Sequence, residues 1–199
     1  TATARPDIPW LTITGTNGKT TTVGMTQSIL QAAGYEALAV GNVGSPVVLA
    51  AAQAKAQVLA VELSSFQLYT IRSLSPLAAV CLNIDADHLD WHGSEAAYVA
   101  AKARVYERAQ KAVLYNQQDP RSLELTLAAE VTEGCRAIGF TTGTPDIYQL
   151  GIVENMLIDR AYSANPYKEA VALVGMGDFH YYHGDPGTTV LQDALAAAG

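Results

Sequence analysis

The chain has 199 residues, of which 49% are hydrophobic and 16% are charged, and its formal net charge is −7. Because no apolar run approaches the roughly 20 residues that span a bilayer, we expect a soluble, cytoplasmic protein with no membrane partner. An acidic chain offers no broad basic surface to nucleic acid, so any phosphate recognition must come from a local site that suits a small anion.

The first predicted unit is a strand, a glycine-containing loop and a helix. The β-prone run Trp10–Thr14 precedes the sequence Gly15-Thr16-Asn17-Gly18-Lys19-Thr20-Thr21, and a helix is expected from Lys19 to about Ala33. Such a loop directs N–H groups inward at a helix N-terminus, while Lys19 adds a full positive charge and Thr20 can hold Mg²⁺. The usual spacing would place glycine at Ile13, so this is a shortened phosphate loop; the alternative is an ordinary strand-to-helix turn.

Strands and helices then alternate along most of the chain. Strands are expected at Glu36–Val40, Gln57–Leu63, Leu77–Ile84 and Ala112–Tyr115, and helices at Val47–Lys55 and Ser94–Gln110. This alternation predicts an α/β fold of the phosphate-loop type, with a mainly parallel sheet covered by helices on both faces. Short strands follow, and they predict a small antiparallel edge sheet: Ala137–Phe140, Tyr148–Val153, Met156–Ile158 and Ala170–Val174. A closing helix is expected at Thr188–Ala198.

Polar residues gather directly after the predicted strands. The carboxyl ends of parallel strands meet at one edge of a sheet, so a single crevice could collect these residues. In strand order they are Lys19 and Thr20; Asn42; Glu62, Ser64, Ser65 and Gln67; Asn83, Asp87, His88 and Asp90; and Asn116 and Asp119.

Three candidate residues, Glu62, His88 and Lys102, could have either a structural or a chemical role. Glu62 could cap the turn after its strand and His88 could be a core histidine, but together they are typical of metal ligands. Lys102 falls on the inward, apolar stripe of its helix, four residues after Tyr98. It could extend its amine to the surface, or burial could lower its pKa so that the neutral amine adds carbon dioxide and becomes an anionic carbamate.

These motifs resemble the Mur ligases of peptidoglycan synthesis, over nearly the whole chain as their central ATP-binding domain. The resemblance is carried by the loop Thr14–Thr21, by Glu62-Leu63-Ser64-Ser65-Phe66-Gln67-Leu68, by Asn83-Ile84-Asp85-Ala86-Asp87-His88-Leu89-Asp90 and by the Tyr98–Tyr106 helix with Lys102. The Glu62–Leu68 segment is similar to the variant typical of the member that adds D-glutamate. The resemblance implies an ATP-dependent amide ligase that joins D-glutamate to UDP-N-acetylmuramoyl-L-alanine through an acyl phosphate.

The resemblance also implies the roles of individual residues. Those expected to bind ATP are Gly15, Thr16, Asn17, Gly18, Lys19, Thr20, Thr21, Asn116 and Asp119. Thr20 and Glu62 would hold one Mg²⁺ ion, and His88 and carbamylated Lys102 would hold a second. Asn42, Ser64 and Gln67 would touch the UDP-linked substrate. Lys19, His88 and Lys102 are the expected catalytic residues.

The resemblance further implies a division into domains. Residues 1–9 are expected to be a linker from a missing N-terminal domain and residues 10–199 the central ATP-binding domain, with the C-terminal domain absent. The isolated chain is then expected to be an inactive monomer. The family's nucleotide-contacting His-Asn pair is replaced by Thr189 and Val190. The alternatives are a nucleotide-binding module without ligase activity, a switch-type NTPase, or a ligase of the folylpolyglutamate type.

Overall fold

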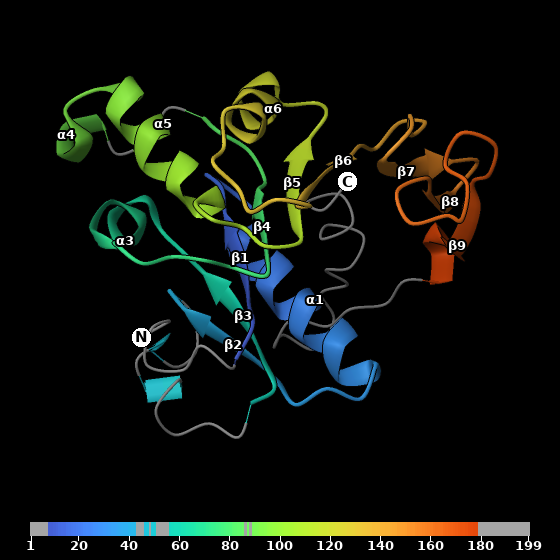
Figure 1. Cartoon of the computed structure of the whole chain (residues 1–199), viewed down its shortest axis with the longest axis horizontal. Coiled ribbons are helices and arrows are strands. Elements are labelled where there is room, and N and C mark those ends of the chain that lie inside the picture. The colour runs from blue at the N-terminus through green and yellow to red at the C-terminus, as the bar shows by residue number, and fades with distance from the viewer. Residues whose placement is uncertain are drawn as a thin grey trace.

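The computed structural model describes residues 8–42, 46, 47, 49, 50, 56–85, 87 and 89–178. Its elements alternate between strand and helix for most of this length, as the sequence predicts (Figure 1). In chain order they are β1 (Trp10–Thr14), α1 (Lys19–Ala32), β2 (Ala37–Gly41), β3 (Val58–Glu62), α3 (Ser65–Thr70), β4 (Ala78–Cys81), α4 (Leu89–His92), α5 (Glu95–Ala103), the 3₁₀ turn η1 (Arg104–Tyr106), β5 (Ala112–Asn116), α6 (Pro120–Leu127), β6 (Arg136–Phe140), β7 (Gln149–Val153), β8 (Met156–Asp159), β9 (Val171–Gly175) and the 3₁₀ turn η2 (Met176–Asp178).

The strands form one nine-stranded sheet in the order β2-β3-β1-β4-β5-β6-β7-β8-β9. All neighbours from β2 to β7 are parallel, whereas β8 pairs antiparallel with β7 and β9 antiparallel with β8. The order places β1 between β3 and β4. The loops that follow these three strands therefore meet at the carboxyl edge of the sheet.

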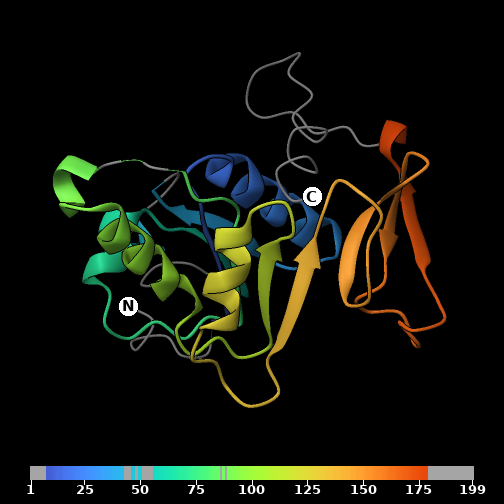
Figure 2. The same cartoon turned by 90° about the horizontal axis from the view of Figure 1, so that it is seen from above.

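Helices cover both faces of the parallel part of the sheet, and Figure 2 shows α1 on one face and α3, α5 and α6 on the other. Alternate residues of each strand point to opposite faces. On β3, Leu59 and Val61 belong to the larger core cluster, which also contains Tyr98 of α5, whereas Ala60 belongs to the cluster that contains Val23 of α1. The α/β prediction with helices on both faces is confirmed.

The predicted antiparallel edge is also confirmed, but it is continuous with the main sheet. We expected the strand at 137–140 to belong to that edge, and instead β6 pairs parallel with β5. The reason is α6, which sequence reasoning missed and which crosses over between these two strands. Its signal was present, because Asp119 caps the helix and Pro120 occupies its first turn, as is typical of a helix start.

The helix predicted at Ser94–Gln110 is shorter than expected. Ser94 is the N-cap, as its position predicts, but α5 ends at Ala103 and the 3₁₀ turn η1 follows. Glu107 has φ −51° and ψ 120°, and Arg108 has a left-handed φ of 54°. The guanidinium of Arg104 donates to the carbonyls of Tyr69 and Ile71. These bonds attach Arg104 to the C-terminal end of α3 and stabilise a turn where the apolar periodicity alone would continue the helix.

Some predictions fall outside the described residues. Residues 1–7 of the expected linker lie outside, while Ile8 is buried in the larger core cluster. Residues 47, 49 and 50 are helical, and the rest of the helix predicted at 47–55 lies outside the description, as does the helix predicted at 188–198. The helices of the described part include none long and apolar enough for a membrane span.

Candidate functional site

The segment Gly15–Gly18 connects β1 to α1, in the strand–loop–helix arrangement predicted for a phosphate loop. Gly18 is the N-cap of α1 and has φ 80°, a left-handed conformation that favours glycine. The Lys19 Nζ donates to the carbonyls of Gly15 and Thr16, each at 2.9 Å, so its side chain folds back over the loop. The first N–H groups of α1 have no partner within the helix. Lys19 and this helix terminus together create a local positive site in an acidic chain.

A hydroxyl and a carboxylate meet beside this helix terminus. Glu62, the last residue of β3, is 1% exposed, and its Oε2 accepts a hydrogen bond from Thr20 Oγ1 at 2.9 Å. Its Oε1 accepts a bond from Asn42 Nδ2 at 3.1 Å. Mg²⁺ prefers oxygen ligands of this kind, so Thr20 and Glu62 fit the role of holding one ion. Asn42 supports Glu62 here, and its contact with a substrate stays a prediction.

Ser64 and Gln67 form the capping box of α3. The Gln67 backbone N–H donates to Ser64 Oγ at 3.3 Å, and the Ser64 backbone N–H donates to Gln67 Oε1 at 2.8 Å. Because Ser64 is the N-cap, the alternative in which Glu62 caps this turn does not fit. The contacts of Ser64 and Gln67 with a substrate stay predictions.

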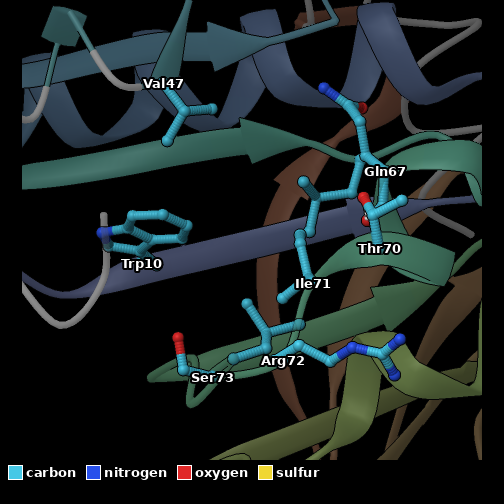
Figure 3. Close-up of a pocket in the computed structure, with 9 residues that line it drawn as sticks. Trp10, Val47, Gln67, Thr70, Ile71, Arg72 and Ser73 are labelled. Atoms are coloured by element: carbon cyan, nitrogen blue, oxygen red, sulfur yellow. Dashed lines mark hydrogen bonds between the residues drawn. The ribbon is translucent and has the colours of Figure 1, made fainter.

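Gln67 also lines a pocket of about 280 Å³, in which Figure 3 shows Trp10 and Ile71 among the surrounding side chains. The remaining lining residues are Val47, Leu63, Thr70, Arg72, Ser73 and Leu74. Leu63 follows β3, whereas Trp10 opens β1. The pocket therefore extends from the carboxyl edge of the sheet toward its amino edge, away from the phosphate loop.

Lys102 lies on the buried face of α5 and reaches the phosphate loop. It is 2% exposed, its Nζ donates to Gly15 O at 2.7 Å, and this Nζ lies 4.9 Å from the centre of the Tyr98 ring. Burial lowers the pKa of the Lys102 ammonium group to about 8, and the charge of Lys19, whose Nζ donates to the same carbonyl, also lowers it. A side chain this buried does not extend to the surface. The carbamate stays a prediction.

The segment after β4 packs directly on the phosphate loop. Thr16 N donates to Asn83 O at 3.0 Å, and the Asn83 side chain bonds both backbone groups of Asn17. Thr16 Oγ1 accepts from Asp85 N at 2.9 Å and is hydrogen-bonded to the Tyr98 hydroxyl at 3.0 Å. Sequence reasoning grouped Asn83 with the polar cluster but gave it no role. His88 lies outside the described residues, so its metal role stays a prediction.

Asn116 and Asp119, predicted to lie near the nucleotide, brace that same segment. Asn116 Nδ2 donates to Leu82 O at 3.0 Å, and Asp119 Oδ2 accepts from Ile84 N at 2.6 Å. Asp119 Oδ1 accepts from Arg121 N at 3.0 Å at the start of α6. Both side chains thus have structural partners, and direct contact with a nucleotide stays a prediction.

The structure therefore brings together Gly15–Thr21 of the loop after β1 and the start of α1, Asn42 directly after β2, Glu62 at the end of β3, and Lys102 on α5. Within the described residues, no group of three or more His, Cys, Asp or Glu side chains could hold a metal ion. A metal at Thr20 and Glu62 would need further oxygen ligands from water or a bound phosphate. The second predicted ion depends on His88 and on a modified Lys102.

The buried Lys102 predicts that stability increases with pH. Its pKa is about 8 in the folded chain and about 10.4 when unfolded, so between these values the unfolded state binds more protons and the free energy of unfolding rises with pH. The free energy of unfolding rises by about 3 kcal/mol in total across this pH range, and the rise is absent well below pH 8, where both states are protonated. Lys102→Met should lack this contribution. Urea unfolding of both proteins between pH 7 and 10.5, in bicarbonate-free buffer, measures the difference; equal pH dependence would contradict the prediction.

Comparison with known proteins gives a family and named relatives. Residues 13–179 match the family described as Mur ligase middle domain. The chain is 50% identical over 196 residues to UDP-N-acetylmuramoylalanine--D-glutamate ligase from Streptomyces coelicolor, with 98% of this chain and 41% of that protein covered. It is 48% identical over 175 residues to the protein of the same name from Thermobifida fusca, with 85% and 37% covered. The chain thus spans less than half the length of these relatives.

Solved structures share the fold at low sequence identity. A UDP-N-acetylmuramoyl-L-alanyl-D-glutamate--2,6-diaminopimelate ligase matches with a TM-score of 0.62 at 20% identity, over 76% of this chain and 35% of that one. The MurF ligase of Thermotoga maritima in complex with ADP matches with a TM-score of 0.56 at 19% identity, over 98% and 46%. E. coli FolC in complex with DHPP and ADP matches with a TM-score of 0.57 at 16% identity, over 100% and 56%.

Proposed function

This chain belongs to the Mur ligase middle domain family, and we propose that it is the ATP-binding central domain of a ligase that adds D-glutamate to UDP-N-acetylmuramoyl-L-alanine in peptidoglycan synthesis. Residues 10–199 would form this domain and residues 1–9 the linker that precedes it. The flanking domains would supply most of the binding surface for the UDP group and for D-glutamate, so the central domain alone would be inactive.

The observation that carries the proposal is the Thr20–Glu62 contact beside Lys19 at the start of α1. Phosphoryl transfer needs donors and a cation for the phosphates, which the start of α1 and Lys19 would supply. It also needs oxygen ligands for a divalent ion, which Thr20 and Glu62 would supply. The choice of D-glutamate as the amino acid rests on the identity to relatives of that name.

The proposed reaction has two steps. A carboxylate oxygen of the L-alanyl group attacks the γ-phosphorus of ATP, the bond from this phosphorus to the β–γ bridging oxygen breaks, and ADP leaves. The D-glutamate amine then attacks the acyl carbon of the resulting acyl phosphate, inorganic phosphate leaves, and the amine loses a proton as the amide forms. Lys19 would stabilise negative charge on the transferring phosphoryl group.

Two Mg²⁺ ions are part of this proposal. Thr20 and Glu62 would hold one, and His88 with carbamylated Lys102 would hold the second. The ions would neutralise charge on the phosphate oxygens during transfer. The close approach of the Lys19 and Lys102 amines to one carbonyl supports a modified Lys102, since a carbamate replaces repulsion between two cations with attraction.

We further propose that the complete ligase is cytoplasmic, because ATP and a nucleotide-linked substrate are both supplied in that compartment, and that it is a monomer. It would have no nucleic-acid or membrane partner, in keeping with the net charge of −7 on the 199 residues of this chain.

A ligation assay with the complete protein tests the proposed function. ATP, Mg²⁺, UDP-N-acetylmuramoyl-L-alanine and D-glutamate should give the amide product and one inorganic phosphate per bond formed. A parallel reaction with a reduced pteroate and L-glutamate should give no product, which separates this ligase from the folylpolyglutamate type. ATP binding without any amide product would instead favour a nucleotide-binding module.

A further inference from the structure

We propose that Asn83 is a positioning residue that fixes the backbone of the phosphate loop for ATP, an inference that rests on the proposed ligase function. Asn83 joins two consecutive loop residues through three hydrogen bonds. Its carbonyl accepts from Thr16 N at 3.0 Å, its Oδ1 accepts from Asn17 N at 2.8 Å, and its Nδ2 donates to Asn17 O at 3.2 Å.

The side-chain amide of Asn83 forms a pair of hydrogen bonds with the backbone of Asn17, one accepted and one donated, as in pairing between β-strands. A carboxamide has an acceptor and a donor side by side, so it can bond the N–H and the C=O of one residue at once. This pairing fixes Asn17 on both sides although Asn17 is exposed. Aspartate keeps the acceptor but lacks the donor, and alanine lacks both.

The consequence of this pairing is a defined set of N–H groups for the phosphates. The N–H groups of Thr16 and Asn17 point to Asn83 and are not available to a ligand. Those of Gly18 and of the first turn of α1 remain for the anion. Donors that are already aimed at the phosphates require no rearrangement when ATP binds or reacts, so loss of the Asn83 bonds should weaken ATP binding.

Asn83 can position the loop because its own segment is fixed from the other side. Asn116 Nδ2 bonds Leu82 O, and Asp119 Oδ2 bonds Ile84 N, so residues on both sides of Asn83 are attached to β5 and to the start of α6. The contact with the loop is also tight, since a Cβ placed on Gly15 would lie 3.0 Å from the Cβ of Leu82. Asn116 and Asp119 therefore support the phosphate loop indirectly, by fixing the segment that contains Asn83.

The test compares Asn83→Ala and Asn83→Asp with the unaltered ligase. Both variants should raise the KM for MgATP at least 10-fold, equivalent to about 1.4 kcal/mol, while the KM values for UDP-N-acetylmuramoyl-L-alanine and D-glutamate stay within twofold. Asn83→Asp keeps the shape and the acceptor but loses the donor and adds negative charge near the phosphates. Its effect should therefore equal or exceed that of Asn83→Ala.

Gln149→Ala is the matched control. Gln149 is 7% exposed, its Oε1 accepts from Asp146 N at 3.0 Å, and its Nε2 donates to the side chain of Gln117 at 3.1 Å. Like Asn83 it uses both groups of its amide, but it lies on β7 and joins two different residues, so its loss should lower thermal stability without changing the KM for MgATP.

Two results would overturn the inference: an unchanged KM for MgATP in both Asn83 variants, or an equal rise of all three KM values, which indicates a general loss of structure. If Asn83→Ala does not fold, the neutral and nearly isosteric Asn83→Leu decides, because it removes the donor and the acceptor without adding charge. Calorimetry with Mg²⁺ and a non-hydrolysable ATP analogue gives the affinity directly. This measurement tests Asn83 even if the complete protein forms no amide bond, so failure of the proposed function and failure of this inference are distinguishable.

Discussion

Replacing Lys19 with alanine is expected to weaken MgATP binding by at least about 100-fold and to leave the fold intact. The Lys19 Nζ bonds two carbonyls of the loop, at Gly15 and Thr16, and the side chain is only half-buried. When ATP binds, this cation can instead make charge-assisted bonds to phosphate oxygens, each worth roughly 1.5–3 kcal/mol. Its removal therefore costs ligand binding far more than folding. Calorimetry of the complete ligase with a non-hydrolysable ATP analogue measures the affinity.

Lys111→Ala is the control for this substitution. Lys111 is exposed and immediately precedes β5, at the amino edge of the sheet, whereas the phosphate loop lies at the carboxyl edge. This variant should keep the full affinity for the ATP analogue, and both variants should melt within a few degrees of the unaltered protein. Equal affinity in Lys19→Ala and the unaltered protein would show that the loop does not bind the phosphates of ATP.

Local sequence patterns were sufficient to find the phosphate loop and the inward lysine. The loop is encoded within a few residues, because glycine, lysine and threonine between an apolar strand and a helix leave few other structures. Lys102 was placed by the 3.6-residue period of its helix, which α5 follows through Tyr98 and Ala101. The lowered pKa that burial on this stripe predicts is found in the structure, but the contact of the Lys102 Nζ with the Gly15 carbonyl, 87 positions away, could not be read from spacing.

Contacts between distant segments could not be predicted in the same way. Asn17 and Asn83 are separated by 66 positions, and they meet only because β1 lies between β3 and β4. The sequence indicates that both residues follow parallel strands, and so share one edge of the sheet, but it does not state which strands are neighbours. The same limit applies to Asn116 and Asp119, whose positions at a strand end are compatible with a ligand contact or with the bracing that the structure shows.

The ends of elements were decided by tertiary bonds. The apolar stripe that predicted one helix from Ser94 to Gln110 continues through Val105 and Ala109, both 0% exposed, although the backbone leaves the α-helix at Ala103. Burial at these positions comes from a 3₁₀ turn and an irregular segment that keep the same residues inside. Periodicity therefore identified the buried residues correctly and the backbone conformation only in part.

Replacing Lys102 with alanine is expected to abolish ligation by the complete enzyme, because the carbamate of Lys102 is proposed to hold the second Mg²⁺. The geometry favours this modification: Lys102 is 2% exposed, burial lowers its pKa to about 8, and a neutral amine is the form that adds carbon dioxide. Lys102→Arg should be equally inactive, since it keeps a positive charge beside the metal and cannot form the carbamate. Phosphate release and amide formation measure the loss.

Two further measurements separate a carbamate from a purely structural lysine. Formate or acetate should partly restore activity to Lys102→Ala, because a small carboxylate can enter the space left by the side chain and face the metal. The same acids should not restore Lys102→Arg, in which that space stays filled. Carbon-13 NMR of the unaltered ligase with labelled bicarbonate should show a carbamate resonance that Lys102→Ala lacks. If Lys102→Ala is fully active and the unaltered ligase shows no such resonance, Lys102 serves only to bond the Gly15 carbonyl beneath the phosphate loop.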